Sequence, residues 1–180
     1  MHRAQLLDLL KDYRTRFPDE DRMCLRMVSF VEQHSRCFER SLAEGHITGS
    51  AWLVDQSGER VLLTHHRKLN RWLQLGGHAD GEPDVLAVAV NEAREESGIR
   101  ELEVCSPFLF DIDVHLIPAR GMDPAHFHYD CRFAVQALTS DIYTVSEESH
   151  DLKWISIKDL STFTREESML RMARKWLDQF

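Results

Sequence analysis

The most informative stretch of the sequence is Gly76-Gly77-His78-Ala79-Asp80-Gly81-Glu82, followed by a predicted helix that ends in Asn91-Glu92-Ala93-Arg94-Glu95-Glu96-Ser97-Gly98-Ile99. The glutamates Glu92, Glu95 and Glu96 are spaced i, i+3 and i+4, so their carboxylates share one helical face. Like charges placed in this way repel one another, and a bound divalent cation removes the repulsion. Oxygen ligands favour Mg²⁺ or Mn²⁺ over zinc. The pattern therefore predicts a metal site beside a glycine-rich loop, with a solvated acidic face as the alternative.

This segment resembles the Nudix box of the Nudix (MutT-like) hydrolase superfamily, whose pattern is G-x5-E-x7-R-E-U-x-E-E-x-G-U with U an aliphatic residue. The residues that match this pattern are Gly77, Glu92, Glu95, Glu96, Gly98 and Ile99. The expected order of strands also fits the family over residues 46–160. The stretch from His65 to Glu82 is similar to a bacterial Nudix subgroup that has a Gly-Gly-His-Ala-Asp-Gly loop.

The resemblance implies a Nudix-type α/β/α sandwich with a mixed sheet. It also implies an enzyme that uses Mg²⁺ or Mn²⁺ to hydrolyse the pyrophosphate bond of a nucleoside diphosphate linked to another group. On this resemblance Glu92, Glu95 and Glu96 are the expected metal ligands, and Glu92 and Glu95 are also expected to act in catalysis.

Two positions depart from the family pattern. Asn91 stands in place of the arginine, and Pro83 stands in place of the first glutamate. The family arginine orients the paired glutamates by ion pairing, whereas Asn91 offers a neutral hydrogen bond. Arg94 does not replace it, because it lies about 200° round the helix from Glu92. The departures leave open an alternative function, a regulatory Nudix-like domain that binds a nucleotide without cleaving it.

The reaction needs a base as well as metal ions. Metal ions must bridge the diphosphate to the carboxylates, and a carboxylate then removes a proton from the attacking water. Family members often place such a base on a late loop, here residues 145–150. Glu148 is the expected base and Glu147 the second choice, with plain surface acids as the alternative.

Residues around the box are candidates for substrate binding. Arg67 is suited to phosphate, and Trp72 either stacks on a base or packs in the core. His65, His66 and Lys68 are further candidates. The expected substrate contacts are Gly77, His78, Arg67, Trp72 and His128.

A second polar pattern lies on two predicted strands. Alternation groups the polar residues on one face of each strand: Asp111, Asp113 and His115 on the first, and His126, His128, Asp130 and Arg132 on the second. If the loop between Pro118 and Pro124 closes a hairpin, the two faces lie side by side, with Asp113 near His128. The patch predicts a wall of the substrate pocket or an additional metal site, and a solvated face is the alternative. A zinc enzyme that uses these histidines is a third class of function.

Composition sets the limits of these interpretations. The chain has 180 residues, with 22 Lys and Arg against 30 Asp and Glu, and a formal net charge of −8. An acidic balance argues against nucleic acid as a partner.

Apolar runs are shorter than the roughly 18 residues that span a bilayer, so no membrane partner is expected. Four scattered cysteines indicate free thiols in a reducing compartment, and the expected location is the cytoplasm.

Periodicity predicts a helical appendage at residues 1–45, and the resemblance implies a Nudix domain at residues 46–180. Pro18 separates two helices in the appendage, which offers structural cover or a surface for a possible homodimer. The expected strands are 47–54, 60–65, 102–117, 126–138 and 152–155. A helix at 84–97 has Asp84 as its N-cap and Gly98 as its C-cap, and a last helix begins at Thr164 with Leu170, Ala173, Trp176 and Leu177 on one face.

Overall fold

A computed structural model describes residues 2–67, 70–122, 124–145 and 149–179. The helices are α1 (Ala4–Arg16), α2 (Asp21–Gln33), α3 (Val85–Ser97), α4 (Leu160–Phe163) and α5 (Glu167–Gln179), with a short 3₁₀ helix at Pro18–Glu20. The strands are β1 (Gly45–Val54), β2 (Arg60–His66), β3 (Arg71–Leu73), β4 (Leu75–His78), β5 (Leu102–Val104), β6 (Asp111–Ile117), β7 (His126–Ala137) and β8 (Ser149–Ser156). The predicted mixed α/β architecture with two N-terminal helices is confirmed.

The sheet is built around β1. Strand β7 runs parallel to β1 along its whole length, from Gly45 opposite Phe127 to Val54 opposite Gln136. Strand β4 pairs antiparallel with the other edge of β1, while β2 meets β1 at a single pair and turns away to pair with β3 and β8. Strands β5 and β6 pair with opposite ends of β7. This single parallel pair makes the sheet mixed, as predicted.

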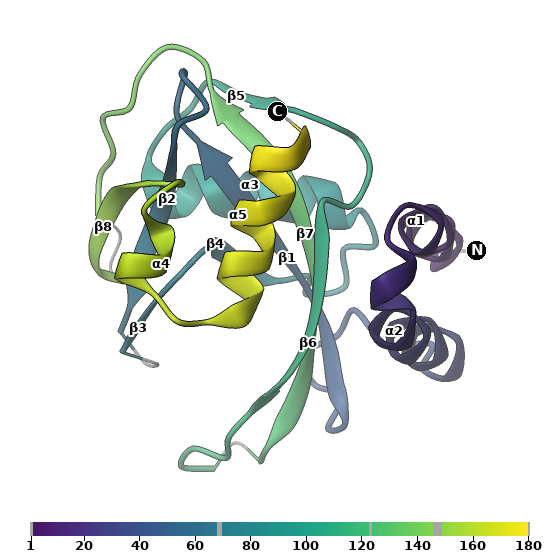
Figure 1. Cartoon of the computed structure of the whole chain (residues 1–180). Helices are drawn as coiled ribbons and strands as arrows, with labels where there is room; N and C mark the ends of the chain where they lie inside the picture. The colour runs from purple at the N-terminus through teal and green to yellow at the C-terminus, as the bar shows by residue number, and fades with distance from the viewer. Residues whose placement is uncertain (1, 68–69, 123, 146–148, 180) are drawn as a thin grey trace.

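Both faces of the sheet are covered by helices (Figure 1). Alternate side chains of β1 point to opposite faces. Ile47 packs with α1 and α2, and Ala51 and Leu53 pack with α3 on the same face. On the other face Trp52 and Val54 pack with α5. The polar residues His46, Thr48 and Ser50 are on the same face of β1 as Trp52 and lie nearer the start of the strand.

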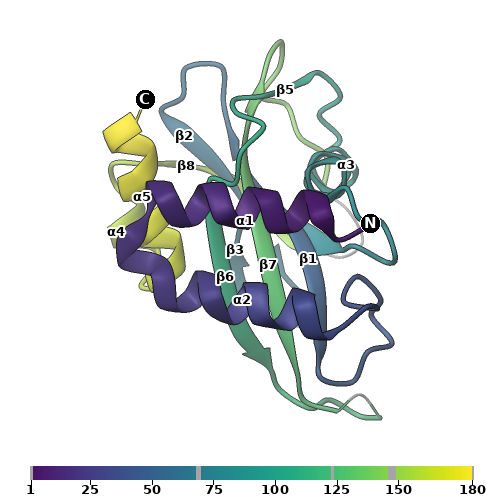
Figure 2. The same ribbon diagram turned by 90° about the vertical axis from the view of Figure 1, so that its right-hand side faces the viewer.

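The two N-terminal helices are part of the same core as the sheet. Figure 2 shows α1 and α2 lying side by side across β1, β6 and β7. Their buried side chains join the sheet residues Ile47, Tyr129 and Cys131 in one apolar cluster, and the ring of Phe30 stacks on Tyr129 at 3.8 Å. None of the helices in the described part of the chain combines the length and apolar character needed to cross a bilayer.

Helix α3 begins and ends where its sequence predicts. The Asp84 side chain accepts a 3.1 Å hydrogen bond from the Ala87 N–H, which satisfies one of the free donors of the first turn. Gly98 has a φ of 73°, and its N–H donates to the Arg94 carbonyl at 2.9 Å. These two caps fix which residues of the helix face the sheet.

Three expectations about the elements are wrong. Residues 102–117 form two strands rather than one, because Pro107 lacks the N–H that would continue the pairing with β7. The stretch Gly76-Gly77-His78 is a strand, β4, and not a loop, because it pairs with β1. Leu177 is 49% exposed, since α5 instead buries Met169 and Met172 against the sheet. Strand β3 and helix α4 were not expected.

Candidate functional site

The glycine pair of β4 brings two box glutamates of α3 against the strand. The Gly76 N–H donates a 2.7 Å hydrogen bond to Glu96 Oε1. A Cβ atom at Gly77 would come within 2.3 Å of Glu92 Oε1, so only glycine leaves room for that carboxylate. On the opposite face a Cβ at Gly76 would lie 2.2 Å from Ser50 Oγ. The two glycines therefore allow β4 to fit between α3 and β1.

Two other positions of the box, Asn91 and Glu95, lie on the outside of α3. Glu96 is 7% exposed and Glu92 is half-buried, whereas Glu95 and Asn91 are exposed. Arg94 is also exposed, and its Nε donates to the Arg100 carbonyl at 3.3 Å. The structure thus brings Glu92 and Glu96 to the glycine pair and leaves Glu95 at the surface beside them.

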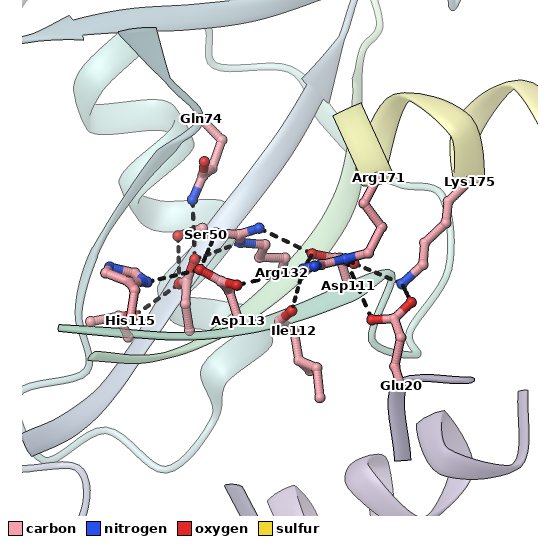
Figure 3. Close-up of polar contacts among 12 residues, drawn as sticks. Glu20, Ser50, Gln74, Asp111, Ile112, Asp113, His115, Arg132, Arg171 and Lys175 are labelled. Carbon is pink, nitrogen blue, oxygen red and sulfur yellow. Dashed lines mark hydrogen bonds and ion pairs between the residues drawn. The ribbon is translucent and has the colours of Figure 1, made fainter. Parts of the chain in front are cut away.

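Beyond the glycine pair, the same sheet contains a buried ionic network (Figure 3). Asp130 Oδ1 accepts hydrogen bonds from Thr48 Oγ1 at 2.8 Å and Ser50 Oγ at 2.7 Å. Its Oδ2 accepts from Gln74 Nε2 at 3.0 Å and Arg132 Nε at 2.7 Å. Burial would raise the pKa of Asp130, but the charge and hydrogen bond of Arg132 outweigh it and the pKa is lowered. This carboxylate is therefore ionised and fully paired.

The network continues from Arg132 to both terminal helices. Arg132 Nη1 donates to Asp111 Oδ2 at 3.0 Å, and Arg171 of α5 contacts both oxygens of that carboxylate at 2.8 Å. Lys175 Nζ lies 2.7 Å from Asp111 Oδ1 and 2.6 Å from Tyr13 Oη of α1. Asp111 is completely buried. The network is a structural support that fixes α1 and α5 to the edge of the sheet.

The predicted hairpin of β6 and β7 is confirmed, with a shift in which residues face each other. His115 pairs opposite His128, and Asp113 pairs opposite Asp130 rather than beside His128. Asp113 Oδ2 lies 2.9 Å from His115 Nδ1 and 3.4 Å from Arg132 Nη2. The polar faces of the two strands do lie side by side, as the alternation predicts.

Histidines gather at the other end of this polar face. The rings of His46, His78 and His128 have centroids 4.8–5.2 Å apart. His126 is 5.0 Å from His46, and His115 is 5.6 Å from His128. Sequence analysis missed His46, although it precedes Thr48 and Ser50 at the two-residue spacing that places all three on one face of a strand.

The residues predicted for substrate binding fall into two groups. Gly77, His78 and His128 lie at the glycine pair and the histidine cluster. Trp72 of β3 is half-buried, stacks on His65 with centroids 5.0 Å apart and meets Phe163 edge-on at 5.2 Å. Arg67 is exposed at the end of β2. The predicted bases Glu147 and Glu148 and the candidate Lys68 lie outside the described residues.

The arrangement agrees with comparisons against known proteins. A family model described as the NUDIX domain matches residues 45–179, which include all three box glutamates and the histidines His46, His78 and His128. The match begins after α1 and α2. A comparison with curated proteins finds no match.

Solved structures show the same fold. A NUDIX-family hydrolase from Clostridium perfringens is 24% identical, with a TM-score of 0.55, over 73% of this chain and 95% of that one. The Ap4A hydrolase of C. elegans, in a binary complex, is 20% identical with a TM-score of 0.58, over 74% of this chain and 98% of that one. The dihydroneopterin triphosphate pyrophosphohydrolase of E. coli is 16% identical with a TM-score of 0.58, over 72% of this chain and 92% of that one. With the family model covering most of the chain, this protein belongs to the Nudix family and is a Nudix pyrophosphohydrolase.

Proposed function

We propose that this protein uses Mg²⁺ or Mn²⁺ to hydrolyse the pyrophosphate bond of a nucleoside diphosphate derivative, releasing a nucleoside monophosphate or a similar phosphate ester. The observation that carries the proposal is the convergence of Glu92 and Glu96 on the backbone of Gly76 and Gly77. Carboxylates one turn apart, held against the two glycines of β4, present the oxygen ligands that these cations prefer.

The donor set fits a hard divalent cation. Glu92 and Glu96 would hold it, and Glu95 lies exposed on the same helix, three residues from Glu92, as a further ligand and catalytic carboxylate. A bound ion would neutralise phosphate charge and lower the pKa of the attacking water. A carboxylate of the chain removes the proton of that water, and Glu148 is the proposed base.

Substrate positioning falls to residues at the edge of the site. The absence of side chains at Gly77 lets the backbone approach a phosphate closely. His78 and His128 lie on the neighbouring sheet face, and we assign them contacts to the substrate. Arg67 supplies a cation for phosphate, and the partly covered ring of Trp72 contributes a stacking face.

The test is hydrolysis of a panel of nucleotide derivatives with Mg²⁺ or Mn²⁺. The panel contains nucleoside triphosphates, nucleoside diphosphate sugars, Ap4A and dihydroneopterin triphosphate. We expect one class to be turned over well above the rest. Glu96→Gln and Gly77→Ala should each reduce turnover by more than about 100-fold, because changes in the outer shell of a metal site alone cost up to about that factor.

Glu101→Gln is the matched control, because Glu101 is exposed and lies just beyond the box. It should retain full turnover. If the wild-type protein binds a nucleotide of the panel but cleaves none, the proposal is wrong. The regulatory alternative would then lead, with the exposed Asn91 in place of the family arginine as its structural basis.

A further inference from the structure

Three neighbouring strands bring three histidines to one point of the sheet. His46 of β1 lies directly opposite His128 of β7 in the parallel pair. His78 ends β4 and pairs opposite Thr48, two residues along β1 from His46. One ring nitrogen from each histidine lies within 4.8 Å of those of the other two. Because all three residues lie on hydrogen-bonded strands, the cluster is held by rigid elements.

Three buried ring nitrogens of His46 and His128 are not satisfied within the described part of the chain. Neither ring nitrogen of His46 has a hydrogen-bond partner there, although the residue is only 3% exposed. Nε2 of His128 is also buried without a partner among those residues. A buried polar atom without a partner costs about 1–3 kcal/mol, so proteins rarely retain one without a reason. Two such rings with centroids 4.8 Å apart indicate a ligand that accepts nitrogen lone pairs.

We propose that His46, His78 and His128 bind one transition-metal ion of the zinc class, at a site distinct from the carboxylates of α3. A set of three imidazoles suits zinc and its neighbours, whereas Mg²⁺ requires oxygen ligands. Nitrogens around zinc lie roughly 3.3 Å apart at a Zn–N distance of about 2.0–2.1 Å, so ring movements of about 1 Å close the cluster on an ion.

A fourth histidine lies next to the cluster. His126 Nδ1 lies 2.9 Å from the Pro124 carbonyl, which can only accept, so Nδ1 is the donor. The ring centroid of His126 lies 5.0 Å from that of His46 and 5.3 Å from that of His128. Asp80, the residue two beyond His78, is ion-paired with Arg40. Three histidines with a fourth position left open are the arrangement found in zinc sites that bind water or substrate.

The ion would tie β4 to the centre of the sheet. Strand β4 pairs with β1 and carries Gly77, where a Cβ atom would meet Glu92, immediately before His78. Successive residues of a strand point to opposite faces. The histidine site and the carboxylate site therefore share one strand but lie on its two faces. An ion on His78 and His128 would meet the substrate in their place, and its binding is measured without any substrate.

The experiment measures metal binding directly, on full-length protein without an affinity tag. Metal-free protein is titrated with Zn²⁺ by calorimetry and with Co²⁺ by visible absorption. We expect one ion per chain, the intense absorption of four-coordinate Co²⁺, and a zinc-dependent rise in Tm that a chelator reverses. His46→Leu and His128→Leu should each weaken zinc binding by more than about 100-fold, because each removes a ligand.

Two controls separate this site from others. His34→Leu alters a histidine at the end of α2, outside the cluster, and should leave zinc binding unchanged. Glu96→Gln should also leave it unchanged, although it lowers turnover if the proposed function holds. The inference is wrong if wild-type protein binds no stoichiometric zinc, or if the histidine variants bind as tightly as wild type. Loss of zinc binding in Glu96→Gln with retention in the histidine variants would assign the ion to the carboxylates instead.

Discussion

The polar face shared by β1, β6 and β7 differs sharply between its two ends. At one end the carboxylate of Asp130 accepts four hydrogen bonds, and Arg132 bridges it to Asp111. At the other end, among the described residues, the buried ring of His46 and the half-buried ring of His128 have buried nitrogens without partners. Both ends are built by the same strands with the same alternation. The difference is that opposite charges complete the first end, whereas the second brings imidazole rings close together without hydrogen bonds at those nitrogens.

The comparison distinguishes a buried network that supports the fold from a cluster of side chains that is a candidate binding site. A buried polar network that is satisfied within the chain fixes one arrangement of its elements, here the docking of α1 and α5. A buried group that lacks internal partners is instead a candidate for an external one. Three substitutions test this distinction, and the expected effect decreases from the first to the third.

Arg132→Met should cause the largest loss. The Arg132 side chain is 3% exposed and pairs with Asp111 and Asp130, so its removal leaves two buried carboxylates without their shared cation. We expect the free energy of unfolding to fall by about 3–5 kcal/mol, measured by urea denaturation. Arg174→Met, on an exposed part of α5, is the control and should change it by less than about 0.5 kcal/mol. A loss below about 1 kcal/mol for Arg132→Met would mean that the network is not a support.

Lys175→Met should cause an intermediate loss. Lys175 Nζ contacts Asp111, Tyr13 and Glu20 and so links α5 to α1, but Asp111 keeps Arg132 and Arg171 after the change. Hydrogen bonds to charged groups contribute about 1.5–3 kcal/mol each, and the retained partners limit the loss to about that range. Hydrogen exchange should show α1 opening more readily than α3. Equal protection of both helices would contradict the assigned link.

His128→Leu should cause the smallest loss in metal-free protein. The leucine replaces a half-buried ring whose buried Nε2 has no partner in the described chain, so no internal hydrogen bond at that atom is lost. We expect a change below about 1 kcal/mol in the free energy of unfolding, because replacing an unpaired polar group with an apolar one is close to neutral. In the presence of zinc the gap between wild type and variant should widen. If His128→Leu without zinc lowers the free energy of unfolding as much as Arg132→Met does, the histidines are part of the network that supports the fold.

Much of the fold follows from local signals in the sequence. The helical spacing of Leu6, Leu7, Leu10 and Tyr13 predicts α1. Three of these side chains are buried, and Leu7 is half-buried. Asp84 and Gly98 predict the ends of α3, and both act as caps. These predictions succeed because capping and burial patterns depend on residues within one or two turns of each other.

Predictions that failed depend on distant partners. Gly76 and Gly77 suggest a loop when taken alone, since glycine weakens an isolated strand. They form β4 because β1 offers a free edge, and the space that their side chains would need is taken by Ser50 of β1 and Glu92 of α3. The split of residues 102–117 occurs between the part that pairs with one end of β7 and the part that pairs with the other, where Pro107 cannot continue the pairing.

The sequence by itself determined the box glutamates, the glycines before them and the alternation of polar residues on β6 and β7, because each pattern lies within one segment. The tertiary structure alone decided which polar groups meet. His46, His78 and His128 lie far apart in the sequence and come together through the parallel pairing of β1 with β7 and the edge pairing of β4. The same pairing joins Asp130 to Thr48 and Ser50. Strand register between distant segments is set by the packing of the whole core, and no local pattern specifies it.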